Sequence, residues 1–152
     1  MTVEEALELR SIAREKGIPF ALAHTYSGHY TLKAMRCLVL SGVLGKLRRL
    51  EASYLQDWQR VNLGIQQEHR QDPAKSGDFN CNGDINTHNE FALRYVTGMR
   101  PDAVSCHTSI YGPDRTLDDD VDTFLWYPNG SRANSKASQI ANGHENDHRV
   151  AV

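Results

Sequence analysis

The sequence predicts an α+β fold, in which a mostly antiparallel sheet carries helices on one face. Residues 2–16, 31–41 and 84–96 repeat apolar side chains at the helical spacing of three and four residues. The last third of the chain instead alternates apolar and polar residues, as strands do. Asn129-Gly130 separates two of these strand patterns and is a typical two-residue hairpin turn. Helices followed by consecutive strands indicate an α+β layer.

Length and composition indicate one globular domain. The chain has 152 residues, 39% hydrophobic and 24% charged, which is too apolar for a disordered protein. A formal net charge of −2 gives no support for nucleic-acid binding, and no apolar run is long enough to span a bilayer. The first residues lack the pattern of a secretion signal. Cys37, Cys81 and Cys106 are few and widely spaced, which predicts reduced thiols in a cytoplasmic protein.

The first 23 residues predict a helix and then a buried strand. Thr2 and Glu5 have the spacing of a capping box, and Gly17 ends the helical pattern. Residues 18–23 form a short apolar run that predicts a buried strand. A helix followed by a buried strand is half of an α/β unit, yet no earlier strand is present for it to pair with.

The next elements are a helix over residues 31–41, ended by Gly42, and a strand over residues 47–55. In that strand Leu50, Ala52 and Tyr54 share one face and are expected to point inward. A short helix is predicted near residues 66–69.

A third long helix begins near Asp84 and ends near Val96, with Gly98 as its cap. Four strands are expected after it, over residues 103–110, 121–127, 131–140 and 148–152. Asn129 and Gly130 are both expected to have positive φ, as the tightest hairpin turns require.

The best candidates for chemistry are Asp84 and His88. They are four residues apart, so a helix starting at Asp84 would present both on one face. The imidazole can move a proton near neutral pH, and the carboxylate can orient it or share a substrate hydroxyl. The alternatives are a helix-capping role for Asp84 and a structural role for His88. The Gly- and Asn-rich loop of residues 76–83 favours a site, because such loops let the backbone approach a ligand.

Arg70 and Lys75 flank that loop and could bind a substrate oxygen or a cofactor charge, or lie on the surface as solvated charges. The polar and aromatic segment of residues 24–30 is either a site loop or a simple connector.

No metal site is expected. The acidic run of residues 118–120, with Asp122, lacks the spacing of a calcium loop and predicts a solvated strand edge. The pairs His24/His29 and His144/His148 have no third ligand at a spacing typical of zinc.

Six segments, in order, resemble the Gfo/Idh/MocA (glucose–fructose oxidoreductase, inositol dehydrogenase and MocA) family. Gly83-Asp84-Ile85-Asn86-Thr87-His88 is similar to that family's Gly-Asp-Ile-Gly-Thr-His signature. The other five matching segments are residues 41–46, 70–77, 95–98, 117–120 and 137–139. The resemblance extends over residues 2–152.

The resemblance implies two parts. Residues 1–30 would be a remnant of the last helix and strand of a Rossmann nucleotide-binding domain. Residues 31–152 would be most of the C-terminal α+β domain, whose open-faced sheet usually forms the oligomer contact. The sequence has no Gly-x-Gly-x-x-Gly segment, and the family's Glu-Lys-Pro segment with its catalytic lysine is also absent from it.

The resemblance also implies roles for individual residues. His88 would transfer a proton, Asp84 would bind substrate hydroxyls and set the imidazole, and Arg70 and Lys75 would lie at the substrate pocket. His24 and Thr25 would lie near the nicotinamide of NAD or NADP. A chain lacking the cofactor-binding half is not expected to bind the dinucleotide tightly or to catalyse hydride transfer alone.

Two departures from the family pattern bear on function. Asn86 replaces the glycine of the signature, and Asn134 and Lys136 introduce polar side chains on one face of a sheet strand. Three hypotheses of function are open. The chain is part of an NAD(P)-dependent sugar or polyol oxidoreductase, as its substrate-binding and oligomerisation domain. Alternatively, it is a non-enzymatic module that binds a polyhydroxylated ligand or self-associates. A third hypothesis is an interaction subunit that completes a separate nucleotide-binding partner.

Overall fold

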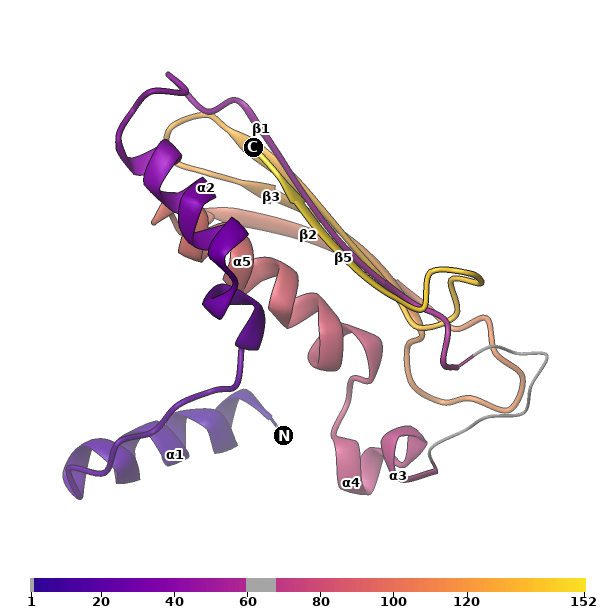
Figure 1. Ribbon diagram of the computed structural model, residues 1–152. Helices are drawn as coiled ribbons and strands as arrows, with labels where there is room; N and C mark the ends of the chain where they lie inside the picture. The colour runs from indigo at the N-terminus through magenta and orange to yellow at the C-terminus, as the bar shows by residue number, and fades with distance from the viewer. Residues whose placement is uncertain (1, 60–67) are drawn as a thin grey trace.

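The computed structural model describes residues 2–59 and 68–152, and one five-stranded sheet organises them (Figure 1). Its strands are β1 Arg49–Gln56, β2 Ala103–Ser109, β3 Asp120–Trp126, β4 Arg132–Ser138 and β5 Asn146–Ala151. They lie in the order β2-β3-β4-β1-β5. Only the central pair of this sheet, β1 and β4, is parallel; the other neighbours are antiparallel. The predicted α+β class is therefore confirmed.

Two helices, α2 (Tyr30–Leu40) and α5 (Thr87–Thr97), cover one face of the sheet (Figure 1). Leu93 of α5 is fully buried against Leu50 and Leu125 of the sheet, while Val96 and Leu32 join α5 to α2. Burying a side chain of this size contributes about 1.5–3 kcal/mol, so the α5 contact fixes the helix on the sheet. The inward face predicted for β1 is confirmed by the burial of its apolar residues.

The first helix, α1 (Val3–Glu15), has the predicted capping box: Glu5 N–H donates to Thr2 Oγ1 at 3.2 Å, and Thr2 N–H donates to Glu5 Oε2 at 2.7 Å. None of its residues is buried. The predicted buried strand at residues 18–23 is wrong. That segment is exposed, with Phe20 at 61% and Leu22 at 72%, and none of the described strands pairs with it.

The hairpin between β3 and β4 differs from the predicted turn. Gly130 has φ +81°, but Asn129 is not left-handed. Gly130 N–H donates to the Tyr127 carbonyl at 2.9 Å, and Tyr127 N–H donates to the Ser131 carbonyl at 3.0 Å. The loop is thus longer by one residue, with glycine alone in the left-handed position that follows an ordinary turn.

The second face of the sheet is not covered by any described helix (Figure 1). Phe124 and Trp126 of β3 are about half exposed on it, with ring centroids 6.4 Å apart. Asn134 and Lys136 share this face, as predicted, because they pair in register with Phe124 and Asp122.

The edge strand β2 is exposed on both faces over most of its length. The alternation of apolar and polar residues in its sequence therefore does not mark a buried face.

Short helices complete the described residues. These are η1 (Thr25–Gly28), α3 (Glu68–Gln71), α4 (Pro73–Ser76) and the π-helical turn η3 (Asn82–Asn86). The helix predicted near residues 66–69 overlaps α3, and residues 66 and 67 lie outside the described ranges. The three cysteines are free. Within residues 2–59 and 68–152, each helix is too short or too polar to cross a membrane.

Candidate functional site

The signature segment folds as the π-turn η3, which runs directly into α5. Asp118, which is 6% exposed, holds the start of this turn: its carboxylate accepts from Asn80 N–H at 2.8 Å and from Asn82 N–H at 2.6 Å. Single π-turns inside helices occur frequently at functional sites. Because Asp118 is bound by backbone N–H groups, the predicted solvated role for this carboxylate is wrong.

Asp119 is also buried, against the same prediction. It is 0% exposed and forms an ion pair with Arg115 at 2.7 Å. Its carboxylate also accepts from the backbone N–H groups of Tyr111 and Gly112, at 2.9 and 2.8 Å. Local spacing could not reveal these partners, because the loop that donates them folds back onto the strand entrance. The acidic run is therefore mainly a structural anchor for the loops around η3.

Asn86, which differs from the glycine of the signature that this segment resembles, ties the π-turn to the sheet. Its Nδ2 donates to Asn82 Oδ1 at 2.9 Å and to Thr123 Oγ1 at 3.1 Å, and its Oδ1 accepts from Ser135 Oγ at 2.7 Å. The side chain is 8% exposed and uses both ends of its amide. The departure from glycine is thus compensated by polar residues on β3 and β4.

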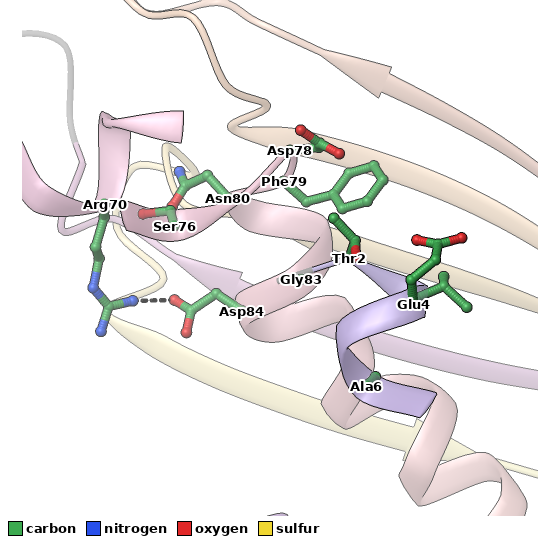
Figure 2. A pocket seen from close by; sticks show the side chains of 11 residues that line it. Thr2, Glu4, Ala6, Arg70, Ser76, Asp78, Phe79, Asn80, Gly83 and Asp84 are labelled. Atoms are coloured by element: carbon green, nitrogen blue, oxygen red, sulfur yellow. Dashed lines mark hydrogen bonds and ion pairs between the residues drawn. The ribbon is translucent and has the colours of Figure 1, made fainter. Parts of the chain in front are cut away.

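Asp84 projects from the π-turn toward Arg70, and the two side chains form an ion pair (Figure 2). Gln139, directly after β4, donates from Nε2 to the same oxygen, Asp84 Oδ2, at 2.8 Å. Oδ1 accepts no hydrogen bond from residues 2–59 or 70–152. The carboxylate is therefore held through one oxygen, and the other has no donor among these residues.

A hollow of about 750 Å³ opens beside this carboxylate. Its walls come from the start of α1, from Arg70 and Ser76, and from the segment around Phe79 and Gly83 (Figure 2). Lys75 is not part of it. That lysine is exposed and pairs with Asp72 at 3.2 Å, so its role in ligand binding stays a prediction.

His88 lies in a cluster of rings. Its ring centroid is 5.1 Å from that of His24, 5.4 Å from Tyr26 and 5.8 Å from Tyr54. Its Nδ1 is buried and has no hydrogen-bond partner among the described residues. Burial lowers the pKa of His88, and the charge of Asp84 opposes that effect. The surroundings therefore favour the neutral imidazole, which is the form that can accept a proton.

His24 stacks on Phe91 with centroids 4.4 Å apart, and Thr25 is exposed in η1. Burial, with smaller effects from His88 and Arg94, lowers the pKa of His24. Of these two residues, His24 is the one whose side chain contacts the ring of His88, the candidate proton-transfer group.

Two tyrosines of this ring cluster also belong to a hydrogen-bond network with Asn146. The hydroxyls of Tyr26 and Tyr54 bond to each other, and Asn146 joins both, at 2.8 Å to Tyr54 and 3.2 Å to Tyr26. Burial, together with nearby His88, lowers the pKa of His148 to about 4. This network links β1 and β5 to the loop that precedes α2.

The structure therefore joins Arg70 to Asp84 and His24 to His88, but no hydrogen bond links Asp84 to His88. The orienting contact expected between the pair is therefore absent: Asp84 accepts from Gln139 instead, and its charge alone acts on His88. Gln139, Tyr26 and Tyr54 were not identified from the sequence, because their contacts depend on sheet pairing and on the placement of η1. The described residues contain no group of three His, Cys, Asp or Glu side chains that could hold a metal ion.

The described residues form an α+β domain, with helices on one face of a mostly antiparallel five-stranded sheet. The chain belongs to the GFO/IDH/MocA family: the model of its C-terminal domain matches residues 32–152.

Relatives match over nearly the whole chain. An uncharacterized oxidoreductase, YfiI of Bacillus subtilis, is 26% identical, over 99% of this chain and 40% of that protein. Levoglucosan dehydrogenase of Pseudarthrobacter phenanthrenivorans is 25% identical, over 95% of this chain and 42% of that protein. The chain thus spans about 40% of the length of these relatives.

Solved structures show the same fold. An inositol dehydrogenase homolog from Azotobacter vinelandii, complexed with NAD+, superposes with a TM-score of 0.92 at 23% identity, over 99% of this chain and 40% of that one. Levoglucosan dehydrogenase in complex with NADH and levoglucosan gives a TM-score of 0.83 at 26% identity, over 97% of this chain and 41% of that one.

Proposed function

We propose that this chain forms the sugar- or polyol-binding wall of an NAD(P)-dependent oxidoreductase of the GFO/IDH/MocA family. The observation that carries the proposal is the geometry of Asp84. Arg70 and Gln139 hold its Oδ2, and Asp84 lines an open hollow, so Oδ1 is the oxygen that would accept from a ligand. A fixed carboxylate oxygen is a strong acceptor for a hydroxyl group. Levoglucosan, bound by a 26% identical relative, is a polyhydroxylated ligand of the matching kind.

The second residue of the proposal is His88. Oxidation of a secondary alcohol releases the hydroxyl proton, and a neutral imidazole is the group that accepts it. Burial keeps His88 neutral, while the nearby charge of Asp84 favours the protonated form once it has accepted the proton. Proton transfer by a positioned residue contributes about 10²–10⁴-fold to a rate.

The residues of this chain do not fit a whole dinucleotide. Its 152 residues contain no Gly-x-Gly-x-x-Gly turn to bind a pyrophosphate. His24, stacked on Phe91, and exposed Thr25 offer at most a contact to the nicotinamide end. The isolated chain is therefore expected to bind the polyol ligand and not to catalyse its oxidation.

Calorimetric titration with levoglucosan and with myo-inositol tests the ligand proposal. Binding should be lost in Asp84→Ala and weakened in Arg70→Met. Arg49→Met is the matched control, because Arg49 forms an exposed pair with Glu51 away from the hollow. Equal affinity in all variants would contradict the proposal.

Two further measurements test the cofactor and catalytic parts. Titration of the isolated chain with NADH should show no tight binding. Tight binding would contradict the inference that the residues of this chain do not form a pyrophosphate-binding turn. When the chain is joined to a nucleotide-binding domain, His88→Ala should reduce turnover by about 10²-fold or more. Unchanged turnover would remove His88 from the mechanism.

We also propose that the uncovered sheet face is a self-association surface. Phe124 and Trp126 place two large aromatic rings side by side on a face that no described helix covers. Adjacent exposed apolar residues of this kind mark contact sites. Light scattering after size-exclusion chromatography should show a dimer that Trp126→Glu dissociates, whereas Phe20→Glu, outside the sheet, should leave it intact. A monomer in the unmodified chain would exclude this surface.

A further inference from the structure

We infer that Gln139 is a positioning residue for Asp84, which fixes the carboxylate so that Oδ1 faces the ligand. The inference rests on the proposed function, because it takes the ligand to be a hydroxyl compound bound at Asp84. The relation between Gln139 and Asp84 itself stands on the geometry.

Gln139 is immobilised at every polar group. It is 0% exposed, its backbone N–H donates to the Asp119 carbonyl at 3.0 Å, and its carbonyl accepts from Gln59 N–H at 3.0 Å. Its side-chain Oε1 accepts from Asn80 Nδ2 at 2.9 Å, and its Nε2 donates to Asp84 Oδ2 at 2.8 Å. A side chain held at both ends cannot rotate away without losing a buried hydrogen bond.

The direction of the Gln139 amide is set by Asn80. Asn80 Nδ2 also donates to the Asp118 carbonyl at 3.1 Å, which identifies that end of Asn80 as the donor. Gln139 must therefore present its oxygen to Asn80 and its NH₂ group to Asp84. Arg70, by contrast, has a side chain that is 37% exposed and reaches Asp84 from outside. The rigid donor to the carboxylate is thus the glutamine.

The charged and titratable groups around Asp84 come from three elements. Arg70 of α3 forms the ion pair, His88 of α5 experiences the carboxylate charge, and buried Cys81, just before η3, does so too. None of these groups replaces the neutral, buried donor that Gln139 supplies.

The test exchanges the donor for an acceptor. Gln139→Glu keeps the oxygen that faces Asn80 and places a second carboxylate against Asp84. Levoglucosan binding, measured by calorimetry near neutral pH, should fall about ten- to a hundredfold, as expected for loss of a charge-assisted hydrogen bond. Lowering the pH toward about 5 should restore part of the affinity, because two adjacent carboxyls share a proton and one becomes a donor again. Gln139→Leu should lose affinity without that recovery.

Asn89→Asp is the matched control. Asn89 is also a fully buried amide, and it donates to the Lys136 carbonyl at 2.8 Å, away from Asp84. The Asn89→Asp variant should be less stable than the unmodified chain. It should not show a loss of levoglucosan affinity that low pH reverses. Wild-type affinity in Gln139→Glu, or a loss that acid does not reverse, would overturn the positioning role.

A measurement on the unmodified chain covers the case in which Gln139→Glu does not fold. The Nε2 protons of Gln139 should resonate downfield in NMR spectra and move upfield in Asp84→Ala. An unchanged resonance in Asp84→Ala contradicts the inference. If the unmodified chain binds neither levoglucosan nor myo-inositol, the proposed function fails, while this spectrum still decides the role of Gln139.

Discussion

Ser135 Oγ donates a 2.7 Å hydrogen bond to Oδ1 of Asn86, which connects the sheet to the π-turn that carries Asp84. Both residues are buried, at 2% and 8% exposure. The opposite end of the Asn86 amide bonds Thr123, so strands β3 and β4 are both fastened to the turn. The position of the candidate site therefore depends on a side chain that a glycine could not replace without changes in the sheet.

Asn86→Ala should destabilise the chain. It leaves the Ser135 and Thr123 hydroxyls without their partner in a buried region, which costs about 1–3 kcal/mol of unfolding free energy. Urea denaturation followed by circular dichroism measures the change. Asn142→Ala, in an exposed turn before β5, is the control and should change stability by less than about 0.5 kcal/mol. Equal losses in the two variants would show that the Asn86 bonds contribute nothing.

Asp119→Ala should be more damaging, because it leaves Arg115 charged and buried without a counter-ion. The two side chains are 0% and 1% exposed, and loss of one partner of a buried pair typically costs about 3–5 kcal/mol. The double variant Asp119→Leu with Arg115→Met removes both charges and should lose less than the single variant. Thermal unfolding of the three proteins provides the comparison, and a double variant as unstable as the single one would contradict this account.

The sequence predicts most of the fold because its signals are local. The capping box at Thr2, the glycine caps at Gly42 and Gly98, and the alternation in β1 are each contained in a few residues, and the structure confirms them. The strand predicted at residues 18–23 is wrong because an apolar run indicates burial only where another element packs against it.

The site was predicted only in part, for the same reason. Asp84, His88 and Arg70 lie in or near one recognisable segment, and the structure pairs Arg70 with Asp84. Gln139 is 55 residues from Asp84, and their contact exists only because β4 lies beside β1 and ends at the π-turn. Burial of Asp118 likewise depends on N–H groups contributed from a distant loop.

Gly98→Ala should destabilise α5 through backbone strain alone. Gly98 has φ +72° at the end of the helix, and an added Cβ would meet no atom within 4 Å. A left-handed conformation costs a residue with a side chain about 1–2 kcal/mol. Gly28→Ala is the control, since Gly28 also has open space but no positive φ. Chemical denaturation should show a loss for the first variant and little change for the second; a reversed order would refute the strain argument.

Stability should fall as the pH drops through the range in which unfolded histidines take up protons. In the unfolded chain His148 binds a proton below its ordinary pKa of 6.5, whereas burial lowers its folded pKa to about 4. The unfolded state therefore binds more protons between these values, so the free energy of unfolding rises with pH across this window and is lost as pH falls. Burial lowers the pKa values of His24 and His88 as well, and both act in the same direction.

His148→Gln should flatten this pH dependence. Glutamine keeps a polar side chain beside Tyr26 and Tyr54 but cannot take up the proton, so its unfolding free energy should decline less between about pH 7 and about pH 5. His107→Gln is the control, because His107 lies exposed on the edge strand β2. It should leave the slope of the unmodified protein unchanged. Urea denaturation at a series of pH values provides the slopes, and identical slopes for His148→Gln and the unmodified protein would show that His148 is not the buried neutral group inferred from its surroundings.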